Sequence, residues 1–245
     1  MVGPTLIGRL GNFMFEVAAA YAYALKHGMD YTINKNEDGS KYIDRFFPHL
    51  ETGKRLPEGY SKWKEPQHNY HEIPYDANVK IEEYFQSEKY FKDYRKEVLE
   101  LFKFPYELNK GVCSIHVRRG DYVTYYTQFP PVTEGYLRKA IELAAANGFT
   151  KFLVFSDGID WCTAVFSTPR YKGYTFEYSE GKNEFEDMAL MSNCEWNIIS
   201  NSTFSWWGAW LNQNPNKIVI SPSKNNWFGK RVKLSTEDII PENWV

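Results

Sequence analysis

The sequence lacks the residues that build a disulfide framework, a zinc knuckle or a membrane span. Its 245 residues include three cysteines, Cys113, Cys162 and Cys194, which lie far apart and form no C-x-x-C pair. We therefore expect reduced thiols that serve as small core residues in a cytoplasmic protein. No run of about 18 apolar residues occurs, and the N-terminus lacks the basic and apolar regions of a secretory signal.

A surplus of basic charge is also absent. The 29 Lys and Arg residues are balanced by 31 Asp and Glu, which gives a formal net charge of −2. This balance excludes nucleic acid as the main partner, because such domains usually carry a basic surplus. The sequence defines no oligomeric state.

Several well-known site patterns are missing as well. There is no D-x-D tripeptide of the kind that binds metal ions, no Walker A loop, no H-E-x-x-H and no G-x-S-x-G. The G-x-G-x-x-G fingerprint of nicotinamide-type dinucleotide sites does not occur either. We accordingly expect no metal ion and no cofactor.

Aromatic residues, by contrast, are abundant, with 8 Trp, 18 Tyr and 17 Phe among the 245 residues. Aromatic faces stack on sugars and bases, and they also fill cores. For the run from Trp206 to Trp210, core packing is the expected role.

The chain begins with a pattern typical of strand, turn and helix. We predict a strand at 5–7, a glycine turn at 8–12 and a helix over 13–27. Asn12 is the expected N-cap and Gly28 the expected C-terminal cap of this helix. The turn alone is weak evidence for a ligand site.

The next part of the chain is less regular. A second strand is expected at 31–33, irregular structure with short helices at 34–80, and a helix over 87–103 that ends before Pro105. We place a domain boundary near 105–111. The predicted domains are residues 1–108 and a Rossmann-like domain of residues 109–245.

The C-terminal half alternates between strands and helices. The expected strands are 112–117, 151–155, 174–178, 196–200 and 217–220, and the expected helices are 134–146, 160–166, 184–193 and 203–211. Such alternation predicts βαβ units and a parallel sheet, and hence an α/β fold.

Polar clusters follow the predicted strands at their carboxyl ends, where α/β sheets bind ligands. The clusters contain Asn12, Arg118, Asp121, Ser156, Asp157, Asn201, Ser202, Thr203 and Ser205. Their shared position predicts one common site.

The cluster from His116 to Asp121 contains two adjacent arginines at a strand end. Residues next to each other in an extended segment point to opposite sides. We expect one arginine to bind phosphate through its guanidinium fork and the other to pair with a carboxylate inside the domain. His116 lies on the same strand face as Arg118 and is expected to contact a base or phosphate, and the alternative is a structural histidine. A surface ion-pair network is the alternative for this cluster.

The cluster from Asn201 to Ser205 joins a strand to a helix. Free N–H groups at a helix start, with hydroxyls beside them, form a phosphate site. Simple capping by Ser202 or Thr203 is the alternative. Two acidic positions, Asp157 and Asp187, are suited to accept hydrogen bonds from a base or a sugar hydroxyl, although Asp187 is equally suited to interact with a helix dipole.

Taken in order, these motifs resemble the bacterial alpha-1,2-fucosyltransferases over most of the chain outside residues 35–110. The matching segments are G-x-L-G-N-x-M-F (Gly8–Phe15), H-V-R-R-G-D-Y (His116–Tyr122), F-S-D with W-C (Phe155–Cys162), D-M-A-L-M-S-N-C (Asp187–Cys194), N-S-T-F-S-W-W-G-A-W-L (Asn201–Leu211) and V-I-S-P…W-F (Val219–Phe228). Each segment alone is unspecific, and the combination is specific.

The resemblance implies a GT-B architecture of two Rossmann-like lobes with parallel sheets facing a central cleft. Residues 1–108 would form the acceptor-side lobe and residues 109–245 the GDP-sugar-binding lobe. The resemblance also implies GDP-L-fucose as donor, no metal, and inverting transfer to the 2-hydroxyl of a galactose-terminated glycan. Arg118 would contact the diphosphate, Arg119 would be the arginine that pairs with a carboxylate inside the domain, and His116 and Asp187 would lie near guanine. Arg9 and Asn12 would face donor and acceptor. The phosphates would be cradled by Asn201, Ser202, Thr203, Phe204 and Ser205.

The chain departs from the family pattern at three positions. Phe13 and Glu16 stand where relatives have glutamine, and Gly158 stands where they have aspartate. We expect Arg118, Asp121 and Asn12 to act in catalysis, with Asp121 or Glu16 as the candidate base. The alternatives are a related transferase with another linkage or nucleotide sugar, and a non-catalytic carbohydrate-binding protein.

Overall fold

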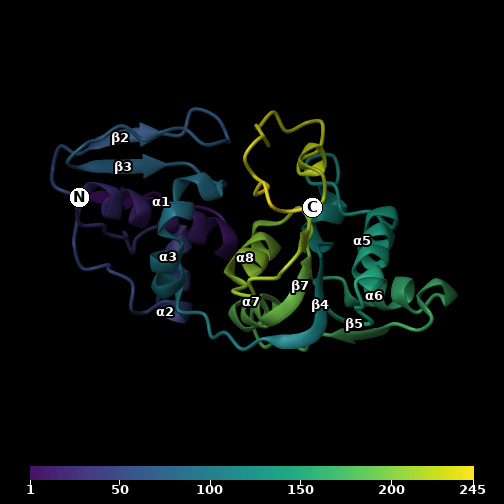
Figure 1. The fold of residues 1–245 in the computed structure, drawn as a ribbon. Helices are drawn as coiled ribbons and strands as arrows, with labels where there is room; N and C mark the ends of the chain where they lie inside the picture. Colours follow the sequence, from purple (N-terminus) through teal and green to yellow (C-terminus); the bar gives the residue numbers. More distant parts are fainter. The chain divides into compact units, whose positions relative to one another are not determined.

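Two parallel β-sheets form the centres of two separate units of the chain. The computed structural model describes residues 1–245. Unit 1 consists of Met1–Phe104 and Leu234–Pro241, and unit 2 of Pro105–Lys233 and Glu242–Val245 (Figure 1). Both units combine helices with a parallel sheet, which confirms the predicted α/β fold with two parallel-sheet lobes. Each unit is described by itself below.

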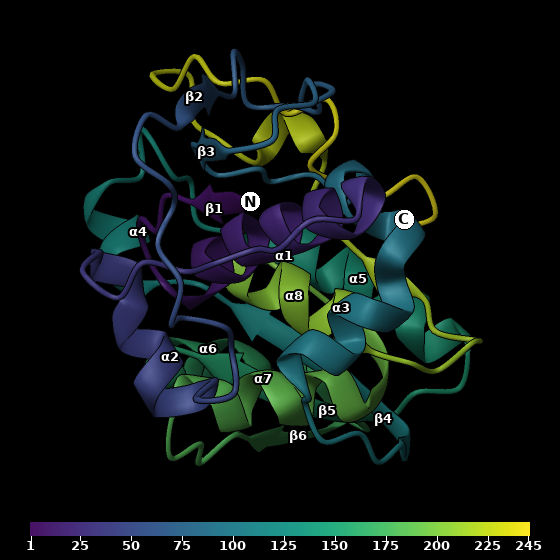
Figure 2. The same ribbon diagram turned by 90° about the vertical axis from the view of Figure 1, so that its left-hand side faces the viewer.

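The sheet of unit 1 has three strands in the order β1-β3-β2, all parallel. These strands are β1 (Val2–Pro4), β2 (Ser61–Lys64) and β3 (Val79–Glu82). Val79 and Ile81 are buried and share a core cluster with residues of α1 (Leu10–His27), which runs beneath the strands in Figure 2. Lys80 and Glu82 alternate to the other face and are only partly buried.

The start of unit 1 differs from the sequence prediction in register. The first strand ends at Pro4, so the prediction of a strand at 5–7 was wrong, and these residues form the connection to α1. Arg9 occupies the N-cap of α1, and Asn12 lies inside the first turn. The prediction for Gly28 is confirmed, since this residue caps the helix with φ 60° and donates to Ala24 and Leu25.

The middle of unit 1 holds structure that the sequence pattern did not predict. Strand β2 and the start of β3 lie within residues 34–80, which were expected to be irregular, and each strand has only four residues. The predicted helix over 87–103 is broken at Phe91, whose ψ of 0° interrupts it. The helical segments are η1 (Asp38–Ser40), α2 (Lys41–Phe46), η2 (Glu88–Tyr90), η3 (Lys92–Tyr94) and α3 (Arg95–Phe102). The strand expected at 31–33 is reduced to one bridge between Tyr31 and Val2.

The sheet of unit 2 has five parallel strands in the order β6-β5-β4-β7-β8. The strands are β4 (Asn109–Val117), β5 (Lys151–Ser156), β6 (Thr175–Tyr178), β7 (Cys194–Ile198) and β8 (Val219–Ile220). The helices are α4 (Gly120–Thr124), α5 (Glu134–Ala146), α6 (Ile159–Phe166), α7 (Glu184–Asn193) and α8 (Thr203–Leu211), with short η4 (Pro169–Tyr171) and η5 (Lys224–Asn226). Figure 1 shows α5 and α6 on one face of this sheet and α7 and α8 on the other.

Alternation along β4 divides its side chains between these two faces. Cys113, Ile115 and Val117 are fully buried in a core cluster with α5 and α6. Ser114 and His116 point the other way, where Ser114 accepts from Asn197 at 2.8 Å. All three cysteines are buried and unpaired, as expected. Helices α5, α7 and α8 have the predicted bounds.

The tryptophan run of α8 belongs to the core of unit 2. Trp206 and Trp207 have no exposed surface and Trp210 has 2%. Trp206 packs against Trp244 near the C-terminus, with ring centroids 5.4 Å apart. The prediction of core packing for this run is therefore confirmed. No helix of the chain combines the length and apolar character needed to cross a membrane.

The segment 234–241 returns to unit 1 and is held there by Asp238. Its carboxylate accepts from the backbone N–H of Tyr70 at 2.9 Å and pairs with Lys89. The predicted division into residues 1–108 and 109–245 does not include this return of residues 234–241 to unit 1. The roles expected of the two lobes stay predictions.

Candidate functional site

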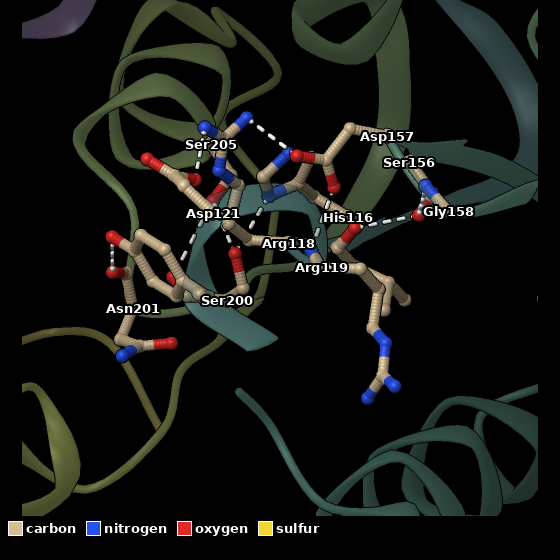
Figure 3. A network of polar contacts seen from close by, with 12 residues as sticks. His116, Arg118, Arg119, Asp121, Ser156, Asp157, Gly158, Ser200, Asn201 and Ser205 are labelled. Atoms are coloured by element: carbon tan, nitrogen blue, oxygen red, sulfur yellow. Dashed lines mark hydrogen bonds and ion pairs between the residues drawn. The ribbon is translucent and has the colours of Figure 1, made fainter. Parts of the chain in front are cut away.

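The candidate site of unit 2 lies at the carboxyl ends of three neighbouring strands. Strand β4 is followed by Arg118, β5 by Asp157, and β7 by Ser200 and Asn201. Because the strands are parallel and adjacent, these residues lie at one edge of the sheet (Figure 3). The structure thus brings together the polar clusters that the sequence placed after these strands.

Arg118 is held by two carboxylates. Its guanidinium donates to Asp121 at 2.6 Å and lies 2.8 Å from Asp157. It also lies over the ring of Tyr122, whose hydroxyl donates to the carbonyl of Asn201 at 2.9 Å. A guanidinium has five N–H donors, and the two ion pairs leave the others free to bind an anion. The fork is therefore fixed in direction before any ligand arrives.

Asp157 also fixes the backbone of the arginine pair. Its second oxygen accepts from the backbone N–H of Arg119 at 2.6 Å. Ser156 joins the same two strand ends, because its hydroxyl donates to the carbonyl of Val117 at 2.7 Å and accepts from the N–H of Gly158 at 2.9 Å. The ends of β4 and β5 are thus bound together by short side chains.

The two arginines do not divide their tasks as the sequence analysis expected. The carboxylate partners belong to Arg118, whereas the guanidinium of Arg119 lies 4.3 Å from the ring of Trp161 and extends away from the cluster (Figure 3). The expectation that Arg119 pairs with an internal carboxylate was wrong, because Asp157 reaches its backbone and not its side chain. The alternation of the two side chains to opposite sides was correct.

Two glycines make this close packing possible. A Cβ on Gly120 would lie 2.3 Å from the carboxylate of Asp157, and a Cβ on Gly158 would lie 2.8 Å from the Cβ of Arg119. Both distances are too short for real contacts, so each position needs the bare backbone. Gly158 therefore matches the local structure here, although the resemblance implies aspartate at this position.

His116 is buried and neutral. Its Nδ1 lies 2.7 Å from the hydroxyl of Ser200, and its ring centroid lies 5.4 Å from that of Phe204. Burial, together with the nearby charge of Arg118, lowers the pKa of His116 to about 3. His116 therefore carries no positive charge toward a phosphate near neutral pH, and its observed role is to bind the end of β7.

The start of α8 offers backbone N–H groups without a side-chain cap. Ser202 occupies the N-cap, yet its hydroxyl accepts no hydrogen bond from the first turn. The hydroxyl of Ser205 instead lies near the carbonyls of Ser200 and Ser202 at 3.3 and 3.2 Å. The alternative of capping by Ser202 is therefore wrong, and capping by Thr203 stays a prediction. A helix start of this kind favours an anion.

Asn201 connects three loops of unit 2. Its amide nitrogen donates to the carbonyls of Pro130 and Trp227 at 3.0 and 2.9 Å. Its side chain is 2% exposed, and the Oδ1 atom has no partner in the protein. Asn201 thus positions the loop before α8, with one acceptor unused.

Asp187 lies apart from the Arg118 cluster, at the end of the edge strand β6. Its carboxylate accepts from the hydroxyl of Ser179 at 2.5 Å, and a Cβ on Gly181 would overlap with it. Burial raises the pKa of Asp187, and the bond from Ser179 opposes that rise. The cap of α7 is Asn183, which accepts from the N–H groups of Phe185 and Glu186. Asp187 lies in the first turn of the same helix, which is the position that the helix-dipole alternative requires.

Arg9 and Asn12 lie in unit 1, after β1. Arg9 is exposed at the N-cap of α1, and Asn12 is half-buried, with its Oδ1 accepting from Gln86 at 3.0 Å. Gly8, with φ 80°, lies against the amide nitrogen of Asn12. The role of both residues toward a ligand stays a prediction.

Sequence reasoning missed several residues that build these sites. Ser200 binds His116, Tyr122 packs on Arg118, and Trp161 carries the guanidinium of Arg119. Tyr122 and Trp161 lie inside the motifs that carry the resemblance, which is the one signal that could have identified them. The partnership of Gln86 with Asn12 has no sequence signal.

Comparison with known proteins identifies the family. The profile of glycosyl transferase family 11 matches residues 3–245. The chain is 34% identical to an alpha-1,2-colitosyltransferase of Escherichia coli, over 69% of this chain and 62% of the relative. It is 36% identical to the O-antigen biosynthesis glycosyltransferase WbnK of Escherichia coli, over 66% of this chain and 58% of the relative. The matches thus span about three fifths of these relatives' lengths.

More distant matches point the same way. A galactoside alpha-(1,2)-fucosyltransferase 2 of Oryctolagus cuniculus is 27% identical over 84% of this chain and 65% of its own. Likeness to solved structures is weaker: NodZ alpha-1,6-fucosyltransferase soaked with GDP-fucose gives a TM-score of 0.45 at 13% identity, over 86% of this chain and 92% of that one. The assignment does not rest on that likeness. From the profile match and the bacterial relatives, the chain belongs to glycosyl transferase family 11.

Proposed function

We propose that this chain transfers L-fucose from GDP-L-fucose to the 2-hydroxyl of a terminal galactoside, with inversion of the anomeric carbon and without a metal ion. The family, and relatives named for alpha-1,2 transfer of colitose or fucose, support the reaction class.

The observation that carries the proposal is the pair of anion-binding features at the ends of β4 and β7. Arg118 is fixed by Asp121 and Asp157 with donors to spare, and the neighbouring start of α8 has no side-chain cap. A diphosphate needs both positive charge and directed N–H groups. These are the groups that would stabilise a departing GDP.

We assign the remaining acidic group, Asp187, to the base of the donor. Asp187 lies in the first turn of α7 and accepts from Ser179, which follows β6. Strand β6 is three strand spacings from β7 in the order β7-β4-β5-β6. Adjacent strands lie about 4.8 Å apart, so this row spans about 14 Å. Such a row suits an elongated ligand with a diphosphate at one end and a base with N–H donors at the other. Guanine has such donors for a carboxylate.

The reaction follows as a single displacement. The acceptor hydroxyl attacks the anomeric carbon while the bond to GDP loosens, through an oxocarbenium-like state. Arg118 and the N–H groups of the first turn of α8 bind the developing negative charge on the leaving phosphate. Because Arg118 is already oriented, little reorganisation is needed when that charge develops.

Burial limits which carboxyl group can act as the catalytic base. Glu16 has no exposed surface, and burial raises the pKa of its carboxyl well above the usual value. A carboxyl with no exposed surface cannot contact an acceptor hydroxyl. Asp121 already accepts from Arg118, and we assign it the task of orienting that side chain.

Transfer of colitose is the second candidate, favoured by the 34% identity to the alpha-1,2-colitosyltransferase. Colitose differs from fucose in lacking one ring hydroxyl, so the same diphosphate site serves both sugars. The donor is therefore decided by contacts to the sugar ring.

Transfer assays with product analysis test the proposal. Purified protein is incubated with GDP-fucose, GDP-colitose or GDP-mannose and a panel of β-galactosides, with EDTA or with magnesium. We expect a 2-linked fucosyl galactoside in both buffers, with the linkage assigned by NMR. Products from GDP-colitose alone would favour the second candidate. Another linkage, transfer only with magnesium, or GDP binding without transfer would contradict the proposal.

A further inference from the structure

Three side chains of unit 1 form a continuous hydrogen-bonded chain that ends on Asn12. Gln86 donates through Nε2 to Oδ1 of Asn12 at 3.0 Å, and Nε2 of His68 lies 3.0 Å from Oε1 of Gln86. Asn12 lies in the first turn of α1, Gln86 follows β3, and His68 follows β2. The chain therefore joins the segments that follow all three strands of the sheet.

The chemistry of the chain fixes its direction. The Oε1 atom of Gln86 can only accept, so His68 must carry its proton on Nε2 and donate. Gln86 then turns its NH₂ group to Asn12, and Asn12 must receive it on Oδ1. The NH₂ group of Asn12 faces the opposite way, over Gly8, where a Cβ would lie 2.4 Å from Nδ2.

The two supporting residues are buried, whereas the residue that they orient is only half-buried. Gln86 is 8% exposed and His68 is 6% exposed, whereas Asn12 is half-buried at the helix start. Burial also lowers the pKa of His68, which keeps the ring neutral. The two supporting side chains are thus suited to act through Asn12.

The backbone that carries Gln86 is held in an unusual conformation. Glu83 and Phe85 have φ of 103° and 52°, and they are two of the three non-glycine residues with positive φ in the chain. Such conformations persist only where the surroundings enforce them, and they cluster at functional sites. The buried carboxyl of Glu65 secures the turn, because it bonds to Tyr90 at 2.8 Å and to the backbone of Phe85.

We infer that Gln86 and His68 are positioning residues that lock the amide of Asn12, so that it presents N–H groups to a sugar oxygen. The inference rests on the proposed function and on the prediction that Asn12 faces the donor and acceptor sugars. An amide locked in this way distinguishes a sugar oxygen that accepts from a hydroxyl that must donate. Gln86 and His68 have no predicted role in the family resemblance described above.

The test reverses the direction of the hydrogen bond between Gln86 and Asn12. Gln86→Glu has the same shape, but its carboxylate accepts from both sides, so Asn12 must turn its NH₂ group inward. Gln86→Met removes both bonds. Gln67→Glu makes the same chemical change at an exposed neighbour and is the matched control. We expect kcat/KM for the acceptor to fall at least tenfold in both Gln86 variants, with unchanged GDP affinity and an unchanged control.

A double-mutant cycle separates positioning from a merely structural role. In an Asn12→Ala background, Gln86→Glu should change kcat/KM by less than about twofold, because its target is gone. An equal loss in both backgrounds, or wild-type kinetics in Gln86→Glu, would overturn the inference.

A spectroscopic readout keeps this test independent of turnover. The side-chain NH₂ resonance of Asn12, assigned by its loss in Asn12→Asp, should move in Gln86→Glu and stay in place in Gln67→Glu. An unmoved resonance would overturn the inference even if the protein transfers no sugar. Absence of transfer by the wild-type protein with a moved resonance would refute the proposed function alone.

Discussion

The guanidinium of Arg118 lies 2.8 Å from the carboxylate of Asp157, which also accepts the backbone N–H of Arg119 at 2.6 Å. One short side chain from β5 therefore orients both the charge and the backbone at the end of β4. This relationship makes the site rigid before a ligand binds, and the predictions for unit 2 depend on it.

Gly120→Ala should damage the site without touching any charged group. The new Cβ would lie 2.3 Å from the carboxylate of Asp157, so that carboxylate must move away from Arg118. We expect at least a tenfold loss of GDP affinity by calorimetry and a destabilisation of about 1–3 kcal/mol from overpacking.

Gly135→Ala is the control for this change. It lies in α5, and its nearest contact would be the hydroxyl of Thr133 at 3.7 Å. Because alanine favours a helix over glycine by about 1 kcal/mol, this variant should keep its GDP affinity and be at least as stable as the wild type. Equal GDP affinity in both variants would show that GDP binding does not depend on the position of Asp157.

Asn201→Ala should destabilise unit 2. Loss of the amide leaves the partly buried carbonyl of Pro130 and the buried carbonyl of Trp227 without their donor. Each unsatisfied group costs about 1–3 kcal/mol, so the free energy of unfolding in urea should fall by about 2–4 kcal/mol. Asn225→Ala, at an exposed position of the same unit, should have little effect. A fall below about 0.5 kcal/mol for Asn201→Ala would show that the two bonds matter little.

Glu65→Gln should change how stability depends on pH. Burial raises the pKa of Glu65 from 4.5 to about 7, so the folded protein holds a proton that the unfolded chain releases. The free energy of unfolding of the wild type, relative to that of Glu65→Gln, is therefore highest below about pH 4.5. It falls as the pH rises to about 7 and is constant above that pH.

The full change corresponds to about 3 kcal/mol. Urea unfolding at several pH values measures it, with exposed Glu58→Gln as the control. A difference between wild type and Glu65→Gln that stays constant across this range would contradict the raised pKa.

Local pattern predicted the helices of unit 2 well, because their caps are local. Helices α5 and α7 are capped by Thr133 and Asn183, whose side chains accept from the first turn, and the apolar spacing that follows is clear. Strands β2 and β3 escaped prediction because four residues give too short an alternation, and their pairing depends on β1.

The sequence predicted which residues form the site, but it did not predict which of them pair with each other. Strand alternation placed Arg118 and Arg119 on opposite sides, but the choice of partner depends on Asp157, which comes from another strand. In the same way, nothing near Asn12 in the sequence indicates Gln86, because the two meet only through the parallel sheet of unit 1. Contacts of this kind are set by topology and register.

The central claim is that Arg118 is the ligand of the donor diphosphate, and a calorimetric titration with GDP in EDTA tests it most directly. Hydrogen bonds to a charged group contribute about 1.5–3 kcal/mol, so Arg118→Ala should bind GDP about tenfold to a hundredfold more weakly than the wild type. Arg138→Ala, which removes an exposed arginine paired with Glu142 in α5, should bind GDP normally. Equal affinity of Arg118→Ala and the wild type, in proteins that unfold at the same temperature, would contradict the account.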